Sequence, residues 1–219
     1  MAKVVIFGLQ DYAELAHYYL THDSDHEVVG FTAHREYLSH AEKFLGLPVC
    51  EFETIGMMFP SDQFSLFAPM APTRVNGLRK SVYEEGLGKG YSFISYVSSK
   101  ATMFDNEVGD NCFVLEDNTL QPFTSIGNNV VLWSGNHIGH HGRILDHVTV
   151  TSHVVISGHC TIEERVFIGV NATLRDGITV GEGALIGMGG VVTKDVEPWS
   201  VYQGNPARKS DKRSDEVGL

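Results

Sequence analysis

The sequence of 219 residues has little of what marks membrane or secreted proteins. No apolar run reaches the roughly 18 residues that a membrane-spanning helix needs. The first residues, Met1-Ala2-Lys3, lead directly into a short apolar segment without a signal-peptide cleavage site. We therefore expect a cytoplasmic protein with no membrane span.

Basic residues are also scarce. The chain has 16 Lys and Arg against 27 Asp and Glu, for a net charge of −11. This charge argues against nucleic acid as a partner, because phosphate backbones need a basic face. A small anionic ligand needs only local positive charge, which the carboxyl end supplies. The basic residues there are Lys194, Arg208, Lys209, Lys212 and Arg213. Beyond Arg208 we expect a solvated, frayed tail.

Cysteine is rare, and its odd count of three argues against a disulfide framework. The phosphate-binding pattern G-x-G-x-x-G is missing from the first strand-to-helix turn, which reads Gly8-Leu9-Gln10-Asp11. A disulfide-rich scaffold is therefore not expected, and the turn alone is only a weak signal for a phosphate site.

What the sequence does contain is a long repeat. From Val108 to Val192, every sixth residue is Val, Leu or Ile, at fifteen consecutive positions. A period of six is a multiple of the strand period of two and not of the helical period of 3.6, so these side chains point inward from short strands. The chain therefore coils. Cys112 and Cys160 both occupy the fifth, small-residue position of a hexad, so we expect buried thiols there and not a disulfide or a metal site.

The residues ahead of the repeat follow a different pattern, in which apolar strands alternate with helices. This pattern predicts strands at 3–8, 27–32, 47–52, 64–70 and 91–97, and helices at 11–20 and 75–85. Such alternation indicates a parallel sheet. We place the boundary near 98–102, which gives an α/β domain over 1–98, a repeat domain over 99–196 and a carboxyl-terminal tail over 197–219.

In a parallel sheet, ligands bind beyond the carboxyl ends of the strands. The first such end is the turn of Gly8, Gln10 and Asp11, which opens a helix. Asp11 also suits the N-cap of that helix, and a bare strand-turn-helix is more often only structural. Because an unshielded carboxylate repels phosphate, contacts to a sugar or a base suit this turn better.

Three stretches of the repeat and its end carry a resemblance to a known family: WSGNHIGHH at 133–141, VVTKDV at 191–196 and GNPAR at 204–208. Together with the α/β domain, they resemble the bacterial nucleotide-sugar acetyltransferases of the sialic acid O-acetyltransferase and sugar N-acetyltransferase group. The resemblance covers essentially the whole chain. It implies a Rossmann-like amino-terminal domain followed by a left-handed parallel β-helix. It further implies a nucleotide-linked sugar in the first domain, acetyl-CoA between coils of neighbouring subunits, and a homotrimer.

In that family three hexads make one coil, so residues three hexads apart lie directly above one another. Fifteen hexads then make five coils. Two departures from the family pattern stand out. Relatives often begin with a glycine-rich loop where this chain has Leu9-Gln10-Asp11, and several follow the catalytic histidine with an acid where this chain has His141.

Acetyl transfer from a thioester needs a base, and histidine suits this role at neutral pH. His141, His147, His153 and His159 share position four of their hexads, whereas His140 alone occupies position three. Three hexads beyond His140 is Gly158, which would leave room for a thioester to approach the imidazole. Both this position and the family motif favour His140 as the base. Asp146, Glu116 and Asp117 are candidates to orient it.

The resemblance and the repeat spacing together assign the remaining roles. The catalytic set is His140, His141 and Asp146. The substrate set is Gly8, Gln10, Asp11, Asn136 and His137. The acetyl-CoA set is Gly158, His159, Val170, Asn171, Gly187, Met188 and Arg208. No metal is required.

Other histidines and the asparagines have plainer interpretations. We expect His147 to be a polar surface or interface residue, and His153 and His159 to pack at an interface or line the acetyl-CoA groove. Asn118 and Asn136, three hexads apart, should stack as an amide ladder inside the coils.

We thus predict an acetyl-CoA-dependent transferase acting on an amino sugar carried by a nucleotide. O-acetylation of a sugar hydroxyl is the nearest alternative. The histidine density also motivates a zinc-dependent β-helix hydratase, in which two subunits gather one metal. A non-catalytic trimer that binds sugar nucleotides is the third alternative.

Overall fold

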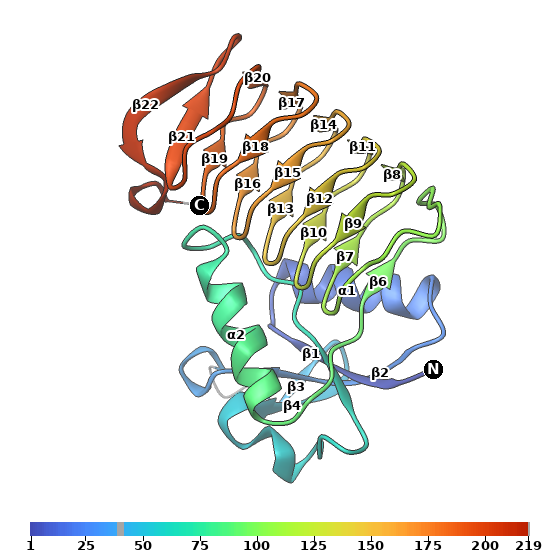
Figure 1. Ribbon diagram of the computed structural model, residues 1–219. Coiled ribbons are helices and arrows are strands. Elements are labelled where there is room, and N and C mark those ends of the chain that lie inside the picture. Colours follow the sequence, from blue (N-terminus) through green and yellow to red (C-terminus); the bar gives the residue numbers. More distant parts are fainter. Residues whose placement is uncertain (39–41, 219) are drawn as a thin grey trace.

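The computed structural model describes residues 1–38 and 42–218. An α/β part built from the first ninety or so residues lies along one side of a prism of coils (Figure 1). The amino terminus belongs to the α/β part, and the chain ends at the far end of the prism. No helix in the described ranges is long and apolar enough to cross a membrane.

The α/β part is a five-stranded sheet with helices on both faces. Its order is β3 (Lys43–Phe44), β4 (Leu47–Glu51), β2 (Glu27–Ala33), β1 (Lys3–Phe7) and β5 (Ser65–Phe67), and only β3 runs antiparallel. Helix α1 spans Asp11–His22 and α2 spans Gly77–Gly88. Short 3-10 segments are η1 (Arg35–Tyr37), η2 (Phe52–Met57) and η3 (Ser214–Glu216).

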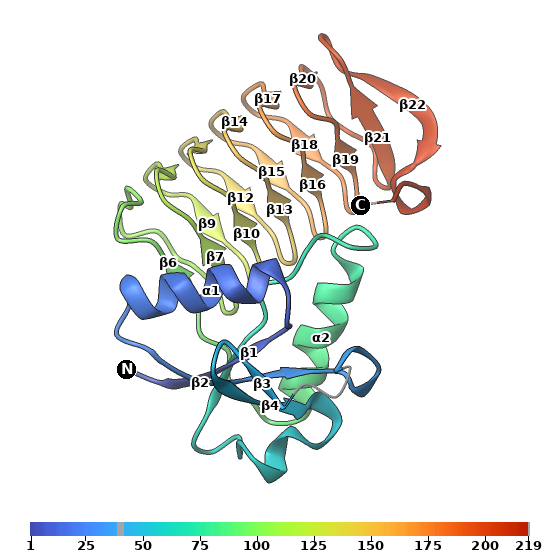
Figure 2. The same cartoon turned by 180° about the vertical axis from the view of Figure 1, so that it is seen from behind.

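Strand β1 explains why both faces are covered. Val4 and Ile6 pack in one apolar cluster with α1, whereas Val5 and Phe7 pack in a second cluster with α2. Alternate side chains of a strand point to opposite faces, so an uninterrupted apolar strand needs cover on both. The α1 cluster continues into outward residues of the coils such as Phe113, which places α1 between the sheet and the prism (Figure 2).

The coils consist of two-residue strands joined by tight corners. The strands are β6 (Tyr96–Val97), β7 (Phe113–Val114), β8 (Thr119–Leu120), β9 (Ser125–Ile126), β10 (Val131–Leu132), β11 (His137–Ile138), β12 (Arg143–Ile144), β13 (Thr149–Val150), β14 (Val155–Ile156), β15 (Thr161–Ile162), β16 (Phe167–Ile168), β17 (Thr173–Leu174), β18 (Thr179–Val180), β19 (Leu185–Ile186) and β20 (Val191–Val192). The longer strands β21 (Ser200–Gln203) and β22 (Arg208–Arg213) close the carboxyl end.

These strands form the three faces of the prism. The face that contacts the α/β part, here the domain face, is β6-β7-β10-β13-β16-β19 extended by β21 and β22. The second face is β8-β11-β14-β17-β20, and the third is β9-β12-β15-β18. From β7 to β20 the partners within each face are parallel and three hexads apart, as Ile138 and Ile156 are, which confirms the predicted stacking. Three parallel faces built from hexads fit a left-handed β-helix.

Three edges separate the faces, and each is named for one residue. The Trp133 edge, with corners such as 133–136, joins the domain face to the second face. The His140 edge, with corners such as 139–142, joins the second face to the third. The His147 edge, with corners such as 145–148, returns to the domain face.

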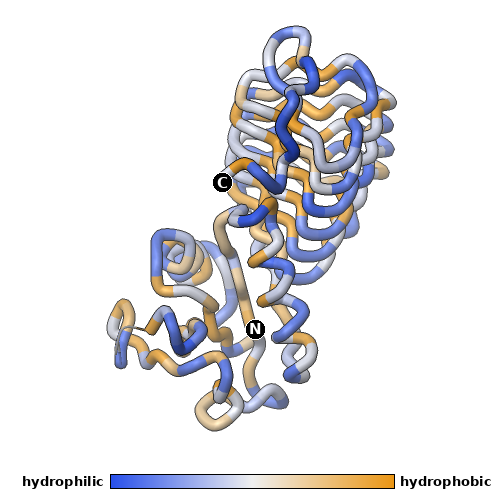
Figure 3. The backbone as a smooth tube through the Cα atoms, turned by 90° about the vertical axis from the view of Figure 1, so that its left-hand side faces the viewer, coloured by the Kyte–Doolittle hydropathy of each residue, from blue (hydrophilic) through white to orange (hydrophobic). Residues whose placement is uncertain are grey.

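The inward residues of the repeat are buried as predicted. Ile138, Ile156 and Leu174 are at most 2% exposed and belong to one continuous apolar cluster along the prism. Hydrophobic segments recur at the same place in successive coils (Figure 3). Cys112 and Cys160 lie in the same cluster as buried free thiols, which confirms that prediction.

Position four of each hexad is the left-handed corner residue. Every sixth residue from 105 to 189 has a positive φ, between 54° and 80°. The set is Asp105, Asn111, Asp117, Phe123, Asn129, Gly135, His141, His147, His153, His159, Arg165, Asn171, Gly177, Gly183 and Gly189. Glycine, asparagine and aspartate tolerate this conformation best, and the shared position explains why the histidines recur in one phase.

Three elements of the structure differ from those predicted from the sequence. The strand at 91–97 is divided, because Phe93 bridges Leu66 of β5 whereas Tyr96 already pairs with Phe113 in the coils. The helix expected from 75 begins at Gly77, since residues 74–76 all have positive φ. The tail expected to fray beyond Arg208 is strand β22, paired antiparallel with β21.

Candidate functional site

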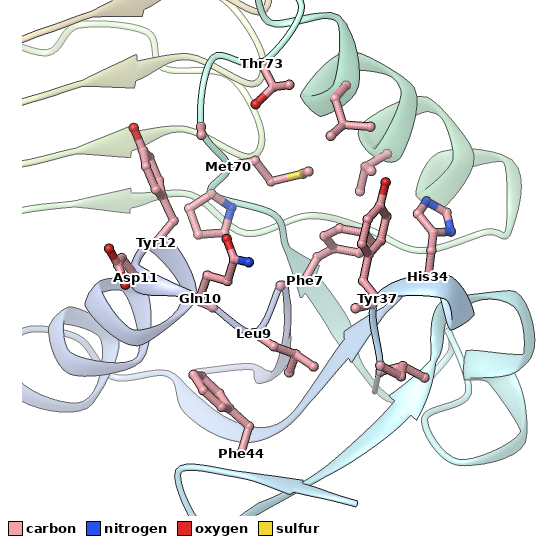
Figure 4. Close-up of a pocket in the computed structure, with 18 residues that line it drawn as sticks. Phe7, Leu9, Gln10, Asp11, Tyr12, His34, Tyr37, Phe44, Met70 and Thr73 are labelled. Carbon is pink, nitrogen blue, oxygen red and sulfur yellow. The ribbon is translucent and has the colours of Figure 1, made fainter. Parts of the chain in front are cut away.

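A cavity of about 730 Å³ opens in the α/β part at the carboxyl ends of β1, β2 and β5 (Figure 4). The predicted substrate residues Gly8, Gln10 and Asp11 line it. Its other walls are Phe7, Leu9, Tyr12, Ala13, Ala33, His34, Tyr37, Leu38, Phe44, Pro69, Met70, Ala71, Thr73, Leu78 and Val82. Most of these side chains are apolar or aromatic, as in sites that hold the flat part of a small ligand.

The first helix turn differs from the N-cap expectation. Gln10 occupies the N-cap position without a side-chain cap bond, and Asp11 is the first residue of α1. In Figure 4, Gln10 points toward Met70, whereas Asp11 lies to one side with Tyr12. The carboxylate thus stands beside the helix amino terminus at the rim of the cavity.

His34, which no sequence motif had indicated, forms part of the opposite wall. Its Nδ1 lies 3.3 Å from Glu53 Oε1, and its Nε2 lies 3.7 Å from Glu85 Oε2. Phe7 and Phe52 contact the ring edge-on, with centroids 5.4 Å and 5.3 Å away. The sequence signal for His34 was its position directly after β2, because ligands bind at the carboxyl ends of parallel strands.

A second group of polar side chains gathers at the His140 edge. His140 Nδ1 lies 3.0 Å from His141 Nδ1, within hydrogen-bond distance. The ring of His159 stacks on that of His141 with centroids 5.0 Å apart and planes 16° apart. The His140 ring stands edge-on to His159, also 5.0 Å away. All three imidazoles are exposed, so the predicted base faces solvent beside two further histidines.

Gly158 lies against His140, although not as expected. A Cβ at residue 158 would come within 2.9 Å of Cε1 and Nε2 of the His140 ring. The room that glycine leaves on the next coil is therefore filled by the imidazole itself. Glycine at 158 allows the ring to lie flat against the coil, and a thioester would have to approach from the outer side.

The three acidic candidates lie away from this group. Asp146 is at the His147 edge, where its Oδ1 accepts a 2.7 Å hydrogen bond from the backbone N–H of Asn128. Glu116 is at the Trp133 edge and accepts hydrogen bonds from Tyr19 and Ser134. Asp117 is the left-handed corner residue beside it. Within one chain, the geometry thus brings His141 to His140 and does not bring Asp146 there.

Asn136 is also placed differently from the sugar contact expected of it. It is 2% exposed, its Nδ2 donates to the Trp133 carbonyl, and its Oδ1 accepts from Val154 N at 2.8 Å. Asn118 donates to the same Trp133 carbonyl at 2.9 Å, so the two amides stack through a shared acceptor and not through each other. Both polar atoms of Asn136 are thus bonded inside the coil, which corrects the prediction of a sugar contact for this residue. His137 lies half-buried on the second face.

The predicted acetyl-CoA residues divide between two edges. Gly158 and His159 lie with His140, whereas Val170, Asn171, Gly187 and Met188 lie at the Trp133 edge. Val170 and Met188, on adjacent coils, are 40% and 80% exposed there. Arg208 begins the exposed strand β22 at the end of the prism. One chain therefore does not bring this set together.

His147 is buried beneath the α/β part and not on the surface. It is 5% exposed, its ring contacts Tyr83 of α2, and its Nδ1 lies 2.8 Å from Asn129 Nδ2. Asn129 Oδ1 in turn accepts from Asn111 Nδ2 at 2.8 Å. Asn111, Asn129 and His147 thus form a ladder with one member on each coil, and their spacing of three hexads was its signal in the sequence. Burial, assisted by nearby Lys80, lowers the pKa of His147 to about 4, so the ring is neutral at pH 7.

Comparison with known proteins first defines a class. Residues 160–194 match a family model described as the hexapeptide repeat of succinyl-transferase. A search of curated protein sequences found no match. The repeat and the three parallel faces place the coils among hexapeptide-repeat folds.

Solved structures then supply particular relatives. Perosamine N-acetyltransferase from Caulobacter crescentus, a histidine variant in complex with CoA and GDP-perosamine, has a TM-score of 0.84 and 21% identity, covering 97% of this chain and 98% of that chain. The acetyltransferase domain of PglB from Neisseria gonorrhoeae has a TM-score of 0.83 and 19% identity, covering 96% and 100%. WeeI from Acinetobacter baumannii has a TM-score of 0.80 and 21% identity, covering 96% and 100%. The chain shares its fold with these proteins over nearly its whole length.

Proposed function

We propose that this protein is an acetyl-CoA-dependent N-acetyltransferase whose acceptor is an amino sugar carried by a nucleotide. The observation that carries the proposal is the exposed His140 imidazole, held against Gly158 on hexapeptide coils that are joined to an α/β part with a ligand-sized cavity. The relatives with the same fold include one in complex with CoA and GDP-perosamine and one with acetyl coenzyme A.

In this proposal the α/β part is a Rossmann-like nucleotide-sugar domain. Its cavity lies beyond the carboxyl ends of parallel strands, the usual place for a nucleotide in such sheets. The apolar walls suit the base and ribose. Asp11 at the rim disfavours a phosphate directly at the α1 amino terminus, because its carboxylate repels phosphate and offsets the positive end of the helix dipole there.

His140 is the proposed general base. Its Nδ1 is occupied by His141, which leaves Nε2 to accept the proton of the acceptor amine. As the amine nitrogen attacks the thioester carbonyl, His140 takes that proton, and the tetrahedral intermediate then expels the CoA thiolate, to which the proton can pass. His141 acts as a positioning residue in the place where relatives often carry an acid.

We further propose that the active unit is a homotrimer, because one chain separates the two halves of the site. Hydrogen bonds from Arg79 to the His147 edge and the contact of Tyr12 with Trp133 fix the α/β part across the domain face. His140 lies between β11 and β12, on the edge opposite that face. A cavity and a base on opposite sides of the prism can meet only across subunits.

The second face is suited to such a contact. Its outward residues are uncharged, and exposed apolar side chains flank it on both edges, including Phe123 at 76% and Met188 at 80% exposure. The outward set is Thr119, His137, Val155, Thr173 and Val191. An uncharged strip rimmed by apolar groups is typical of a surface covered by a partner. A second copy placed there would bring its Trp133 edge, with Val170 and Met188, near the His140 edge.

The test is a turnover assay that follows thiol release from acetyl-CoA with a panel of dTDP-, UDP- and GDP-linked amino sugars. We expect activity with at least one acceptor, and a fall in kcat of roughly 10²–10⁴-fold in His140→Ala with unchanged thermal unfolding. The matched control is His22→Ala, an exposed histidine in the last turn of α1, which should retain activity. Absence of thiol release with every acceptor, or full activity in His140→Ala, would refute the proposal.

A further inference from the structure

The three histidines at the His140 edge meet the geometric requirements of a metal site. His140, His141 and His159 each offer one ring nitrogen, and these three atoms lie within 4.8 Å of one another. Zinc–imidazole bonds of about 2.0–2.1 Å at tetrahedral angles place ligand nitrogens about 3.3 Å apart. The His140 and His141 Nδ1 atoms are already 3.0 Å apart, so modest side-chain rotations would complete the triangle.

The coil fixes two of these ligands before any ion arrives. His141 and His159 are left-handed corner residues at the same position of adjacent coils, with φ of 55° and 58°. Their rings stack because the interstrand spacing holds the two backbones in register. His140 approaches from the side. All three rings are exposed, so an ion can reach them without unfolding of the chain.

We infer that this cluster binds one divalent transition-metal ion of the zinc class per chain and that the ion inhibits the enzyme. Neutral imidazoles suit Zn²⁺, Co²⁺, Ni²⁺ and Cu²⁺ and do not suit Mg²⁺ or Ca²⁺. An ion bound to His140 removes the base from proton transfer. The inhibitory half of this inference rests on the proposed function, whereas the binding half does not.

The experiment separates these two halves. Purified full-length protein, freed of metal with a chelator, is titrated with Co²⁺ without acyl donor or acceptor, and the visible d–d absorption and the binding isotherm are recorded. His141→Gln and His159→Gln should each weaken Co²⁺ binding by at least about tenfold, since each removes one of three ligands. His22→Gln is the matched control, because this exposed histidine lies in the last turn of α1, away from all three edges of the coils. Thermal unfolding of each variant verifies the fold.

We expect one Co²⁺ per chain with a tetrahedral spectrum. Zn²⁺ should displace the Co²⁺, and Co²⁺ binding should be weaker in His141→Gln and His159→Gln and unchanged in His22→Gln. In the turnover assay, Zn²⁺ should inhibit the wild type, and a chelator should restore the rate. If no binding is seen at millimolar Co²⁺, or if neither His141→Gln nor His159→Gln weakens binding, the proposed metal site is wrong. Activation by Zn²⁺ overturns the inhibitory role. A protein that binds Co²⁺ as predicted but transfers no acetyl group overturns the proposed function and leaves the metal site standing.

Discussion

At the scale of single residues, the edge on which a histidine lies decides what it can do. His141, His147 and His159 share position four and the same left-handed backbone. His141 and His159 stand exposed beside His140, whereas the α/β part covers His147 and an asparagine holds its Nδ1. The sequence predicted the shared position and singled out His140. It did not show which corner the α/β part would cover, because that depends on contacts with residues more than sixty positions away.

The buried His147 should make the fold sensitive to acid. Its pKa falls from 6.5 to about 4 on folding, so the stabilisation from keeping it neutral is complete above pH 6.5 and is lost as pH falls toward 4. The loss over that window is roughly 3 kcal/mol, at about 1.4 kcal/mol per pKa unit. In His147→Gln, whose amide oxygen can still accept from Asn129, urea unfolding should depend less on pH across this window.

The comparison for that experiment is His153→Gln, which removes an exposed histidine at the equivalent repeat position. Its unfolding midpoint should follow the wild type at every pH. If His147→Gln shows the same acid sensitivity as the wild type, the ring is not kept neutral by burial, and the account of the His147 edge is wrong.

At the scale of elements, one side chain of α2 fastens the α/β part to the coils. Arg79 is 1% exposed. Its Nη1 donates to Thr149 Oγ1 at 3.1 Å, and its Nη2 donates to the carbonyls of His147 and Val148 at 3.0 and 3.1 Å. Asn76, the residue before α2, accepts from both Arg79 and Thr149. Burial lowers the pKa of Arg79 to about 10, so the guanidinium remains charged at neutral pH.

Removing this guanidinium should loosen the junction. We expect Arg79→Met to lower the free energy of unfolding by about 2–4 kcal/mol, because several buried oxygens lose a charged donor. Urea denaturation measures the loss. Arg175→Met, at an exposed site on the coils, should change stability by no more than about 0.5 kcal/mol. Equal effects of the two substitutions would contradict the role given to Arg79.

The elements also show what a sequence period can predict. The hexads predicted the coils and the buried thiols, because period six fixes which side chains point inward. The stacking of residues three hexads apart followed from the family resemblance. The period could not predict that Tyr96 leaves the α/β sheet to pair with Phe113, since both pairings suit an apolar strand. Nor could the period predict β22. Its exposed, charged sequence is typical of a solvated tail, and it forms a strand because it pairs with β21.

At the scale of the whole molecule, the same limit applies to the candidate site. The sequence predicted its parts: the turn at Gly8, His140 and the corners at 158 and 188. It could not show that the cavity, the His140 edge and the Trp133 edge lie on different sides of one prism. That arrangement depends on how the three faces and their corners are placed in space. Because the parts of the site lie apart in one chain, the arrangement predicts that subunits assemble to complete it.

The central claim is that each site combines the cavity of one chain with His140 of another, and mixed subunits test it most directly. Thr73→Trp fills the cavity, and His140→Ala removes the base, so each variant alone should be inactive. If the two are co-expressed and assemble together, about a quarter of the sites in random trimers pair an intact cavity with an intact His140. We predict that the mixture regains about that fraction of wild-type activity. A co-expressed mixture as inactive as the separate variants would contradict the claim.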